Sequence, residues 1–400
     1  MIPIYLDYNA TTPIDPAVVE AMLPYLRERF GNPSSAHEHG VRARAAVERS
    51  RSEVARLIGA EPDEIVFTSG GTEATNHAIK GAAFAAPDRA GQQVVISAVE
   101  HSATEATARF VGRLGFKRVV VEVDRLGVVD LDALERSLRA PTLLVSVMHA
   151  NNETGSLQPI AEIAKLAHAR GALVHVDAAQ SAGKVEVHVA AFGADLLTIA
   201  GHKMYAPKGV GALYVRRGVR LAPFIHGAGQ ESGRRAGTEN VPYIVALGEA
   251  CRIAREALPE AGARMQQLRD RLWTRLEAGL RDRVVLNGHP ERRLPNTLNA
   301  SFIGHVGSEL LAALPEIAAS TGSACHEGQV SISPVLAAMR LDPAVARGAV
   351  RLTVGRFTTE AEVDRAAALL VERADADAVR PRARAGATAA TSAPRDSTRT

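Results

Sequence analysis

Short, mostly apolar runs recur between residues 64 and 215, and segments with helical patterning separate them. Apolar runs of four to seven residues without regular polar alternation are typical of strands that are buried on both faces of a sheet. Strands that alternate with helices form a mostly parallel sheet flanked by helices, so we predict an α/β fold. The runs lie at residues 64–67, 94–97, 119–123, 142–148, 173–177, 196–199 and 212–215.

The length of the chain predicts more than one domain, because 400 residues exceed what one simple core holds. The alternating pattern lies within residues 15–258, which we assign to a large domain. Residues 1–14, a short strand and a turn, join residues 259–374 in a smaller α+β domain. From about residue 375 the chain is rich in Ala, Arg, Thr, Ser and Pro without periodicity, so we predict a disordered tail over residues 375–400.

The charge of the chain argues against a nucleic-acid partner, although the sequence pI is about 9.0. Residues 380–400 hold five arginines and one aspartate, a net charge of +4, whereas the whole chain carries +3. The rest of the chain therefore carries −1 and lacks the basic surface of a nucleic-acid-binding domain.

Targeting signals and metal sites are also not expected. The first residues, MIPIYLDYNATTP, lack a basic region and reach Asp7 too early for a signal peptide, and no apolar run approaches the ~20 residues of a membrane span. Two cysteines cannot build a disulfide framework, so we expect a reducing cytoplasm. Cys325 and His326 have no second ligand pair nearby in sequence, so no metal is predicted.

Four polar residues come shortly after predicted strands: His101, Asn152, Asp177 and Lys203. The carboxyl ends of parallel strands meet at one edge of a sheet, where open α/β folds bind their ligands. We therefore expect these side chains to lie together although they are scattered in sequence.

Lys203 is unusual because the chain holds only six lysines among its 47 basic residues. Unlike arginine, a buried lysine can lose its proton and form a Schiff base. A lysine on one strand and an acid, Asp177, on another match the needs of a pyridoxal phosphate enzyme, in which the acid holds the pyridine nitrogen protonated. An ordinary surface lysine and a helix-capping aspartate remain the alternative.

The stretch TSGGTEATN at residues 68–76 joins a predicted strand to a helix. Bare backbone N–H groups, the helix dipole and hydroxyl groups make such a turn a site for an anion. The alternative is a simple helix cap formed by Thr72 and Thr75. A glycine-rich segment at residues 227–240, GAGQESGRRAGTEN, is a second candidate functional loop because of its length.

The two cysteines lie in different surroundings. Cys251 falls within an apolar helix, which predicts a packed core thiol. Cys325 lies among small and polar residues in STGSACHEGQ, ahead of a predicted helix at residues 333–339. A thiol in such a loop is accessible and can act as a nucleophile, with an incidental loop cysteine as the alternative.

The sequence resembles the class V aminotransferase family, and within it the cysteine desulfurases, over residues 4–372. These proteins are pyridoxal phosphate enzymes of fold type I. The resemblance rests on ten motifs in the order and spacing of the family: LDYNATTP, GNPSSAH, FTSGGTEATNHA, EHSA, NNETG, HVDAAQ, GHKMYAPKG, GTEN, GSAC and RLTVGRFTTEAE.

The resemblance implies pyridoxal 5'-phosphate as the cofactor and assigns residues to each part of it. Lys203 would be the Schiff-base lysine and Asp177 the partner of the pyridine nitrogen. Other residues would contact the ring or the phosphate. These are His101 on the ring face, where it would also assist proton transfer, Asn152 and Gln180 near the phenolic oxygen, and Gly71, Thr72 and His202 at the phosphate. Thr238 would reach the phosphate of a partner subunit. At Ala200 the chain departs from the family, in which a serine that contacts the phosphate is common.

The resemblance also implies the substrate and the route of the sulfur. Arg351 would bind the carboxylate of L-cysteine as a bidentate fork, with Asn152 beside it. Cys325 would take the sulfur as a persulfide while L-alanine is released. A homodimer, and a sulfur-acceptor protein such as an iron–sulfur scaffold, are the expected partners. The nearest alternative is a selenocysteine lyase, which shares the same fold and motifs.

Overall fold

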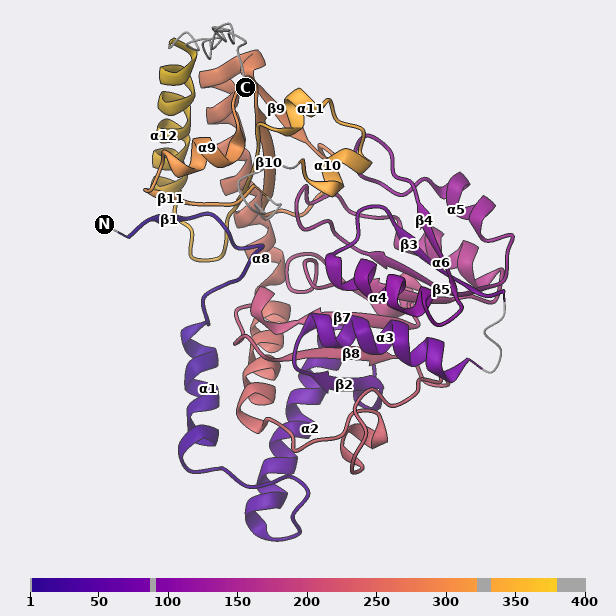
Figure 1. Cartoon of the computed structure of the whole chain (residues 1–400). Coiled ribbons are helices and arrows are strands. Elements are labelled where there is room, and N and C mark those ends of the chain that lie inside the picture. The colour runs from indigo at the N-terminus through magenta and orange to yellow at the C-terminus, as the bar shows by residue number, and fades with distance from the viewer. Residues whose placement is uncertain (1, 87–90, 322–331, 380–400) are drawn as a thin grey trace, which may run out of the picture.

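The computed structural model describes residues 2–86, 91–321 and 332–379 (Figure 1). Its largest feature is a seven-stranded sheet in the order β2-β8-β7-β6-β5-β3-β4. All neighbouring pairs are parallel except those of β8, which runs antiparallel to both β2 and β7. The α/β prediction is therefore confirmed. The strands are β2 Ile65–Thr68, β3 Gln93–Ser97, β4 Lys117–Val121, β5 Thr142–Met148, β6 Leu173–Asp177, β7 Leu196–Ala200 and β8 Gly211–Val215.

Helices cover both faces of this sheet. Side chains of α3 Gly71–Ala85 and α4 Ser102–Gly112 pack on one face. Those of α2 Glu38–Ile58, α6 Ile160–His168 and the first half of α8 Val241–Leu280 pack on the other. This double covering explains why the central strands are apolar on both sides and do not alternate. Shorter or peripheral helices are α1 Pro16–Arg27, α5 Leu131–Ser137 and α7 Val189–Phe192, with the 3-10 turns η1 Pro62–Glu64, η2 Gly201–Lys203 and η3 Gln230–Gly233.

A second hydrophobic core lies beyond the end of the large sheet, and α8 connects the two (Figure 1). The three-stranded antiparallel sheet of this region has the order β12-β10-β9, and β1 pairs with β11 beside it. Leu6 belongs to this second core, which ties the start of the chain to the C-terminal part. The elements are β1 Ile4–Tyr5, η4 Arg281–Arg283, β9 Val284–Asn287, β10 Thr297–Phe302, α9 Gly307–Ala312, β11 Ile317–Ala318, α10 Pro334–Ala338, α11 Pro343–Ala346, β12 Ala349–Thr353 and α12 Glu360–Val379.

We propose that the two cores mark two domains, divided near residue 258 within α8 and completed by residues 1–14. The predicted beginning of the tail needs a correction, because α12 continues to Val379. Ala374 packs in the second core, and Asp375 forms an ion pair with Arg283 at 2.6 Å, which explains why the helix continues past residue 375. Residues 380–400 lie outside the described part of the chain.

Two further predictions can be compared with the described residues. The strand predicted at residues 119–123 lies two residues earlier, at Lys117–Val121. Because β4 is the edge strand, its first residues are exposed and basic, and apolar patterning does not reveal them. Cys251 is fully buried in α8, as predicted, and burial raises the pKa of its thiol. Within the described ranges, no helix is both long and apolar enough to span a membrane.

Candidate active site

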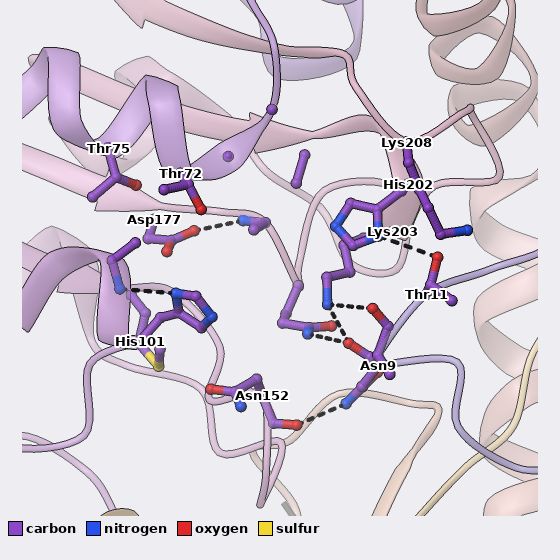
Figure 2. A pocket seen from close by; sticks show the side chains of 18 of the residues that line it. Asn9, Thr11, Thr72, Thr75, His101, Asn152, Asp177, His202, Lys203 and Lys208 are labelled. Atoms are coloured by element: carbon purple, nitrogen blue, oxygen red, sulfur yellow. Dashed lines mark hydrogen bonds between the residues drawn. The ribbon is translucent and has the colours of Figure 1, made fainter. Parts of the chain in front are cut away.

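A pocket of about 720 Å³ lies at the carboxyl ends of the central strands (Figure 2). Strands β5, β6 and β7 end at it, and α3 and α4 begin there. Residues that are far apart in sequence meet in it because parallel strands share one carboxyl edge. Nine of the eleven predicted site residues line the pocket: Gly71, Thr72, His101, Asn152, Asp177, Gln180, His202, Lys203 and Arg351.

Asp177 is the last residue of β6 and is 7% exposed. Its Oδ1 accepts a hydrogen bond from the backbone N–H of Ala179 at 2.9 Å. Burial raises the pKa of this carboxyl, and the Ala179 N–H, His101 and Lys203 oppose the rise. Among the described residues Asp177 has no ion-pair partner within 4 Å, so a cation bound beside it would stabilise its charged form.

Lys203 ends η2, directly after β7, and its side chain enters the pocket (Figure 2). Its Nζ donates hydrogen bonds to the backbone oxygens of Asn9 and Ala10, the latter at 3.0 Å. Burial and the charge of Arg351 lower the pKa of Lys203 to about 8, while Asp177 and Asp7 oppose the shift. A substantial fraction of this amine is therefore neutral near pH 8, as a nucleophilic lysine requires.

The start of α3 forms one wall of the pocket. Its N-cap is Gly70, at φ 149°, and no side chain in the described part of the chain caps the first turn. The alternative in which Thr72 and Thr75 serve as simple caps is therefore wrong, since Thr72 lies inside the helix and Thr75 contacts Thr198 at 3.3 Å. The uncapped N–H groups are free to bind an anion.

Close packing holds this wall near the sheet. A Cβ atom added to Gly71 would lie 3.1 Å from the Cβ of Ala200, and one added to Gly211 would lie 2.8 Å from Gly70. Glycine at these two positions lets the α3 turn approach β7 and β8. An anion at this turn would therefore meet the backbone N–H groups of α3 at close range.

Two histidines of the pocket have defined orientations. The Nδ1 of His101 accepts a hydrogen bond from the Ala103 N–H at 3.1 Å, so His101 caps α4. The Nδ1 of His202 lies 3.2 Å from the Thr11 hydroxyl. Burial and the nearby Lys203 lower the pKa of His202 to about 4, so this ring is neutral at neutral pH.

Gln180 is held by an unexpected neighbour, Lys184. The Lys184 side-chain amine is buried and donates to Gln180 Oε1 at 2.9 Å and to Asn9 Oδ1 at 3.1 Å. Burial lowers the pKa of Lys184 well below its usual value. Because Lys184 offers hydrogens to the amide oxygen, the Gln180 NH2 group turns away from it and donates to the Asn9 carbonyl at 2.9 Å.

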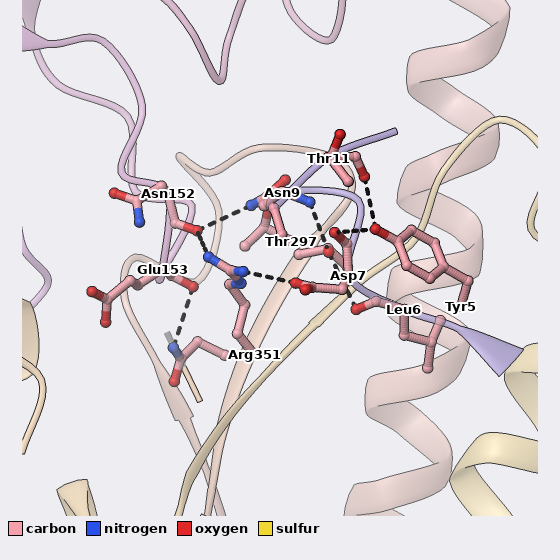
Figure 3. A network of polar contacts seen from close by, with 12 residues as sticks. Tyr5, Leu6, Asp7, Asn9, Thr11, Asn152, Glu153, Thr297 and Arg351 are labelled. Carbon is pink, nitrogen blue, oxygen red and sulfur yellow. Dashed lines mark hydrogen bonds and ion pairs between the residues drawn. The ribbon is translucent and has the colours of Figure 1, made fainter. Parts of the chain in front are cut away.

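Arg351 lies on β12 and reaches the pocket from the second core (Figure 3). Its Nη2 forms an ion pair with Asp7 Oδ1 at 2.7 Å, and its Nη1 donates to the Asn152 carbonyl at 3.1 Å. Its Nε is buried and has no partner among the described residues. The arginine that we expected to bind a substrate carboxylate thus already has a carboxylate beside it.

The other two predicted site residues, Thr238 and Cys325, are not among the described residues that line the pocket. Thr238 lines a neighbouring cavity of about 170 Å³, which shares Ser69, Gly209 and Val210 with the main pocket. Cys325 lies outside the described residues. The residues on either side of its segment are placed: Ser320 pairs with Arg351 through backbone hydrogen bonds, and the Ser333 hydroxyl donates to Glu153 at 2.5 Å.

Asn9 is the residue that our sequence reasoning missed most clearly. It is 1% exposed and comes from the N-terminal segment. It shares hydrogen bonds with Thr297 on β10, with Thr353 on β12 and with residues that follow strands of the large sheet, such as Asn152 (Figure 3). Its place in the LDYNATTP motif was the available signal, but the motif alone does not tell where the segment lies. Its partners are Asn152, Gln180, Lys184, Lys203, Asn296, Thr297 and Thr353.

The electrostatics of Lys203 give a prediction that needs no ligand. Competitive acetylation of the apoprotein, followed by mass spectrometry, is expected to titrate Lys203 with a midpoint near pH 8 rather than near 10.5. Arg351→Gln removes a cation that lowers this pKa, so the midpoint should rise. Asp177→Asn removes an anion that raises it, so the midpoint should fall. Shifts of the same sign in both variants would contradict this account.

Comparisons with known proteins agree with this geometry. The family described as aminotransferase class-V matches residues 4–366. The chain is 45% identical over 363 residues to the cysteine desulfurase IscS of Dictyoglomus turgidum, covering 90% of this chain and 92% of that protein. Among solved structures it is similar to a NifS-like protein and to SspA in complex with cysteine.

The first of these structures has a TM-score of 0.86 and 38% identity, and the comparison covers 94% of this chain and all of the other. The second has a TM-score of 0.79 and 35% identity, with 89% and 99% covered. The resemblance found in the sequence motifs is therefore confirmed over nearly the whole chain. This chain belongs to the class V aminotransferase family.

Proposed function

We propose that this chain is a cysteine desulfurase, which takes the sulfur atom of L-cysteine, releases L-alanine and holds the sulfur as a persulfide on Cys325. The observation that carries the proposal is the meeting of a partly buried lysine, Lys203, and a buried acid, Asp177, in one pocket at the carboxyl edge of the sheet. The name of the relative from Dictyoglomus turgidum and the structure of SspA with cysteine support the choice of substrate.

Pyridoxal 5'-phosphate is the cofactor that the residues of the pocket fit. Asp177 would hold the protonated ring nitrogen, since a buried carboxyl that forms no ion pair with any described residue favours a cation beside it. Lys203 would hold the aldehyde carbon. The N–H groups at the start of α3, with Thr72 and His202, would hold the phosphate. Once bound, the cofactor supplies a ring that accepts the electrons of the substrate's α-carbon.

The remaining residues of the pocket would orient the ring. The amide hydrogens of Gln180 are turned away from Lys184, so one of them is available to an oxygen substituent of the cofactor. Asn152 lines the same side of the pocket. We assign His101 to the ring face, where its hydrogen bond to the Ala103 N–H keeps the imidazole in place and leaves Nε2 for proton transfer.

Arg351 would bind the carboxylate of the substrate, with Asn152 as a neighbour. Its buried Nε, which has no partner among the described residues, supports this role, because an unused guanidinium N–H group can donate to a carboxylate oxygen. Lys203 would then move the proton from the α-carbon. Its pKa of about 8 is suited to this task, since a group whose pKa is near the working pH exchanges protons efficiently.

The thiolate of Cys325 would take the sulfur. The carbon–sulfur bond of L-cysteine breaks, a sulfur–sulfur bond forms on the protein, and a proton added to the freed carbon completes L-alanine. Two contacts support a role for Cys325 at this pocket, because they involve residues on either side of it in sequence. Ser320 pairs with Arg351, and Ser333 contacts Glu153, the neighbour of Asn152. Burial raises the pKa of Glu153, whereas the Ser333 hydroxyl and Arg351 oppose that rise.

We also propose the setting in which the enzyme works. A homodimer would place Thr238 of one subunit near the phosphate of the other, and a sulfur-acceptor protein would receive the persulfide. Thiolate chemistry requires a reducing compartment, so we assign the enzyme to the cytoplasm. A net charge of −1 outside residues 380–400 supports a role without nucleic acid.

The proposed activity is tested by supplying the purified protein with pyridoxal 5'-phosphate, L-cysteine and a thiol reductant. L-alanine and sulfide should then appear in equal amounts, and omission of the cofactor from the apoprotein should abolish both. Pyruvate and ammonia in place of alanine would show that the protein eliminates sulfide rather than transferring sulfur, and would refute the assignment.

Ala200 offers a gain-of-function test of the phosphate site. It is 3% exposed and faces Gly71 across the turn of α3. Ala200→Ser adds a hydroxyl group where the anion would bind, so the dissociation constant of the cofactor should fall about tenfold, as for a hydrogen bond to a charged group. Ala212→Ser is the matched control, because Ala212 is buried on β8 outside the pocket. An equal or weaker affinity in Ala200→Ser would place the phosphate elsewhere.

A further inference from the structure

Asp7 lies beside Arg351 in a way that the proposed reaction does not explain (Figure 3). The Asp7 carboxylate contacts Nη2 of Arg351 at 2.7 Å, and the two side chains are 20% and 7% exposed. Arg351 lines the pocket, whereas Asp7 comes from the N-terminal segment that follows β1. A protein carboxylate therefore occupies part of the guanidinium that would bind the carboxylate of an amino acid.

The hydrogen bonds of Arg351 leave one N–H group unused, but the charge of the guanidinium is already paired. Nη1 is used by the Asn152 carbonyl and Nη2 by Asp7, while Nε is buried without a partner in the described part of the chain. An incoming carboxylate that binds the Nε edge meets an arginine whose charge is already balanced. It must share the guanidinium with Asp7 or displace it, and either event costs part of the attraction.

We propose that Asp7 is an internal competitor of the substrate carboxylate and that it sets the affinity of the pocket for amino acids. This inference rests on the proposed role of Arg351 in binding that carboxylate. While the pocket holds no amino acid, Asp7 neutralises the buried guanidinium and keeps it oriented. When an amino acid binds, its carboxylate takes over the Arg351 charge from Asp7. The arrangement stabilises the free enzyme and weakens the binding of every carboxylate ligand.

Backbone contacts hold the N-terminal segment in place, and with it the position of Asp7 beside Arg351. The Tyr5 hydroxyl donates to the carbonyl oxygens of Asp7 and Thr11, and Asp7 bridges to Thr353 on β12. These contacts use the backbone of Asp7 and not its carboxylate. A substitution that changes only the side chain should therefore leave the segment in place.

The test is Asp7→Asn in the holoenzyme, with L-alanine as a probe of the carboxylate site. Asparagine keeps the shape and one acceptor oxygen but removes the charge. The dissociation constant of L-alanine, followed by the absorbance of the bound cofactor, should fall about tenfold, because the arginine is left without its anion. L-Alaninamide, which lacks the carboxylate, should bind the wild type and Asp7→Asn equally well. The KM for L-cysteine should fall together with the dissociation constant of L-alanine.

A second readout is thermal unfolding. Without ligand, Asp7→Asn should unfold at a lower temperature than the wild type, since a buried cation has lost its partner. Saturating L-alanine should raise the unfolding temperature of the variant more than that of the wild type. Asp7→Glu, which restores a carboxylate, should return both measurements toward the wild-type values.

Asp15→Asn is a matched control. Asp15 also comes from the N-terminal segment and pairs with an arginine near β12, Arg356, at 2.8 Å, with side-chain exposures of 14% and 17%. Arg356 does not line the main pocket. Asp15→Asn should therefore lower the unfolding temperature without changing the affinity for L-alanine.

Two results would overturn the proposal, and a third separates it from the proposed function. Weaker L-alanine binding in Asp7→Asn would mean that Asp7 positions Arg351 for the ligand and does not compete with it. Unchanged binding, with Asp7→Asn still reducing stability, would mean that the ion pair is structural only. If Arg351→Gln binds L-alanine and L-alaninamide as the wild type does, Arg351 is not the carboxylate site, and the role proposed for it fails first.

Discussion

Lys203→Ala is expected to lower alanine release from L-cysteine by at least about 10³-fold, because the variant lacks both the attachment point of the cofactor and the group that moves the proton. The pocket around it should stay intact, since the Lys203 side chain bonds only to the backbone oxygens of Asn9 and Ala10 among the described residues. Loss of activity should therefore occur without loss of the fold, which circular dichroism can verify.

Covalent attachment is the readout that assigns this effect to Lys203 itself. Borohydride reduction and peptide mapping should find the pyridoxyl group on Lys203 in the wild type and on no lysine in Lys203→Ala. Two other lysines are close enough to serve as alternatives: Lys184, which lies behind Gln180, and Lys208, which lines the pocket. A pyridoxyl group on either of them in the wild type would refute the assignment.

Cys325→Ser is expected to bind amino acids normally and yet release little alanine from L-cysteine. Binding depends on Arg351, Lys203 and Asp177, which the substitution leaves in place. Sulfur transfer depends on a thiolate, and serine stays protonated near neutral pH and attacks sulfur poorly. We expect alanine release to fall by about 10²-fold or more, with the L-alanine dissociation constant unchanged.

The other cysteine provides the matched control. Cys251 is fully buried in α8, so Cys251→Ser should keep the wild-type rate and lose only about 1–3 kcal/mol of stability, the cost of an unpaired hydroxyl group in a core. Activity toward selenocysteine distinguishes a desulfurase from the alternative, a selenocysteine lyase, because selenium leaves more readily than sulfur without a protein nucleophile. A selenocysteine lyase would keep its activity toward selenocysteine in Cys325→Ser. Wild-type alanine release from L-cysteine in that variant would exclude Cys325 as the acceptor.

The strands and the edge at which they meet could be predicted from the sequence because the signal is local. Asp177 ends one apolar run and Lys203 follows another, and the rule that parallel strands share a carboxyl edge places them together without any tertiary information. The character of Cys251 was equally readable from its apolar helix. The anion site at the start of α3 was predicted, but whether Thr72 capped the helix could be decided only from the backbone at Gly70.

The contributions of the N-terminal segment could not be predicted in the same way. Asn9 reaches the pocket, and Asp7 reaches Arg351, because β1 pairs with β11, more than 300 residues away in sequence. Neither hydrophobic periodicity nor a turn motif predicts that pairing. In the sequence, nothing distinguishes Lys184 from an ordinary surface lysine. In the fold it is buried, and Gln180 and Asn9 supply acceptors for it. Polar networks of this kind follow from the assembled fold and not from local patterns.

The end of the C-terminal helix α12 could be predicted only approximately from composition. The composition changes near residue 375, but an ion pair from Asp375 to Arg283 and the packing of Ala374 extend α12 to Val379. Composition reports what a segment could do alone, whereas contacts with the rest of the chain decide where a helix ends.

The most direct test of the proposed desulfurase is to locate the sulfur after one turnover. The holoenzyme is mixed with L-cysteine without a reductant, alkylated, digested and analysed by mass spectrometry, while L-alanine is counted in the same sample. We predict one added sulfur atom on the peptide that contains Cys325, one L-alanine per sulfur, and no added sulfur on the peptide that contains Cys251. Alanine formed without sulfur on the Cys325 peptide would contradict the account.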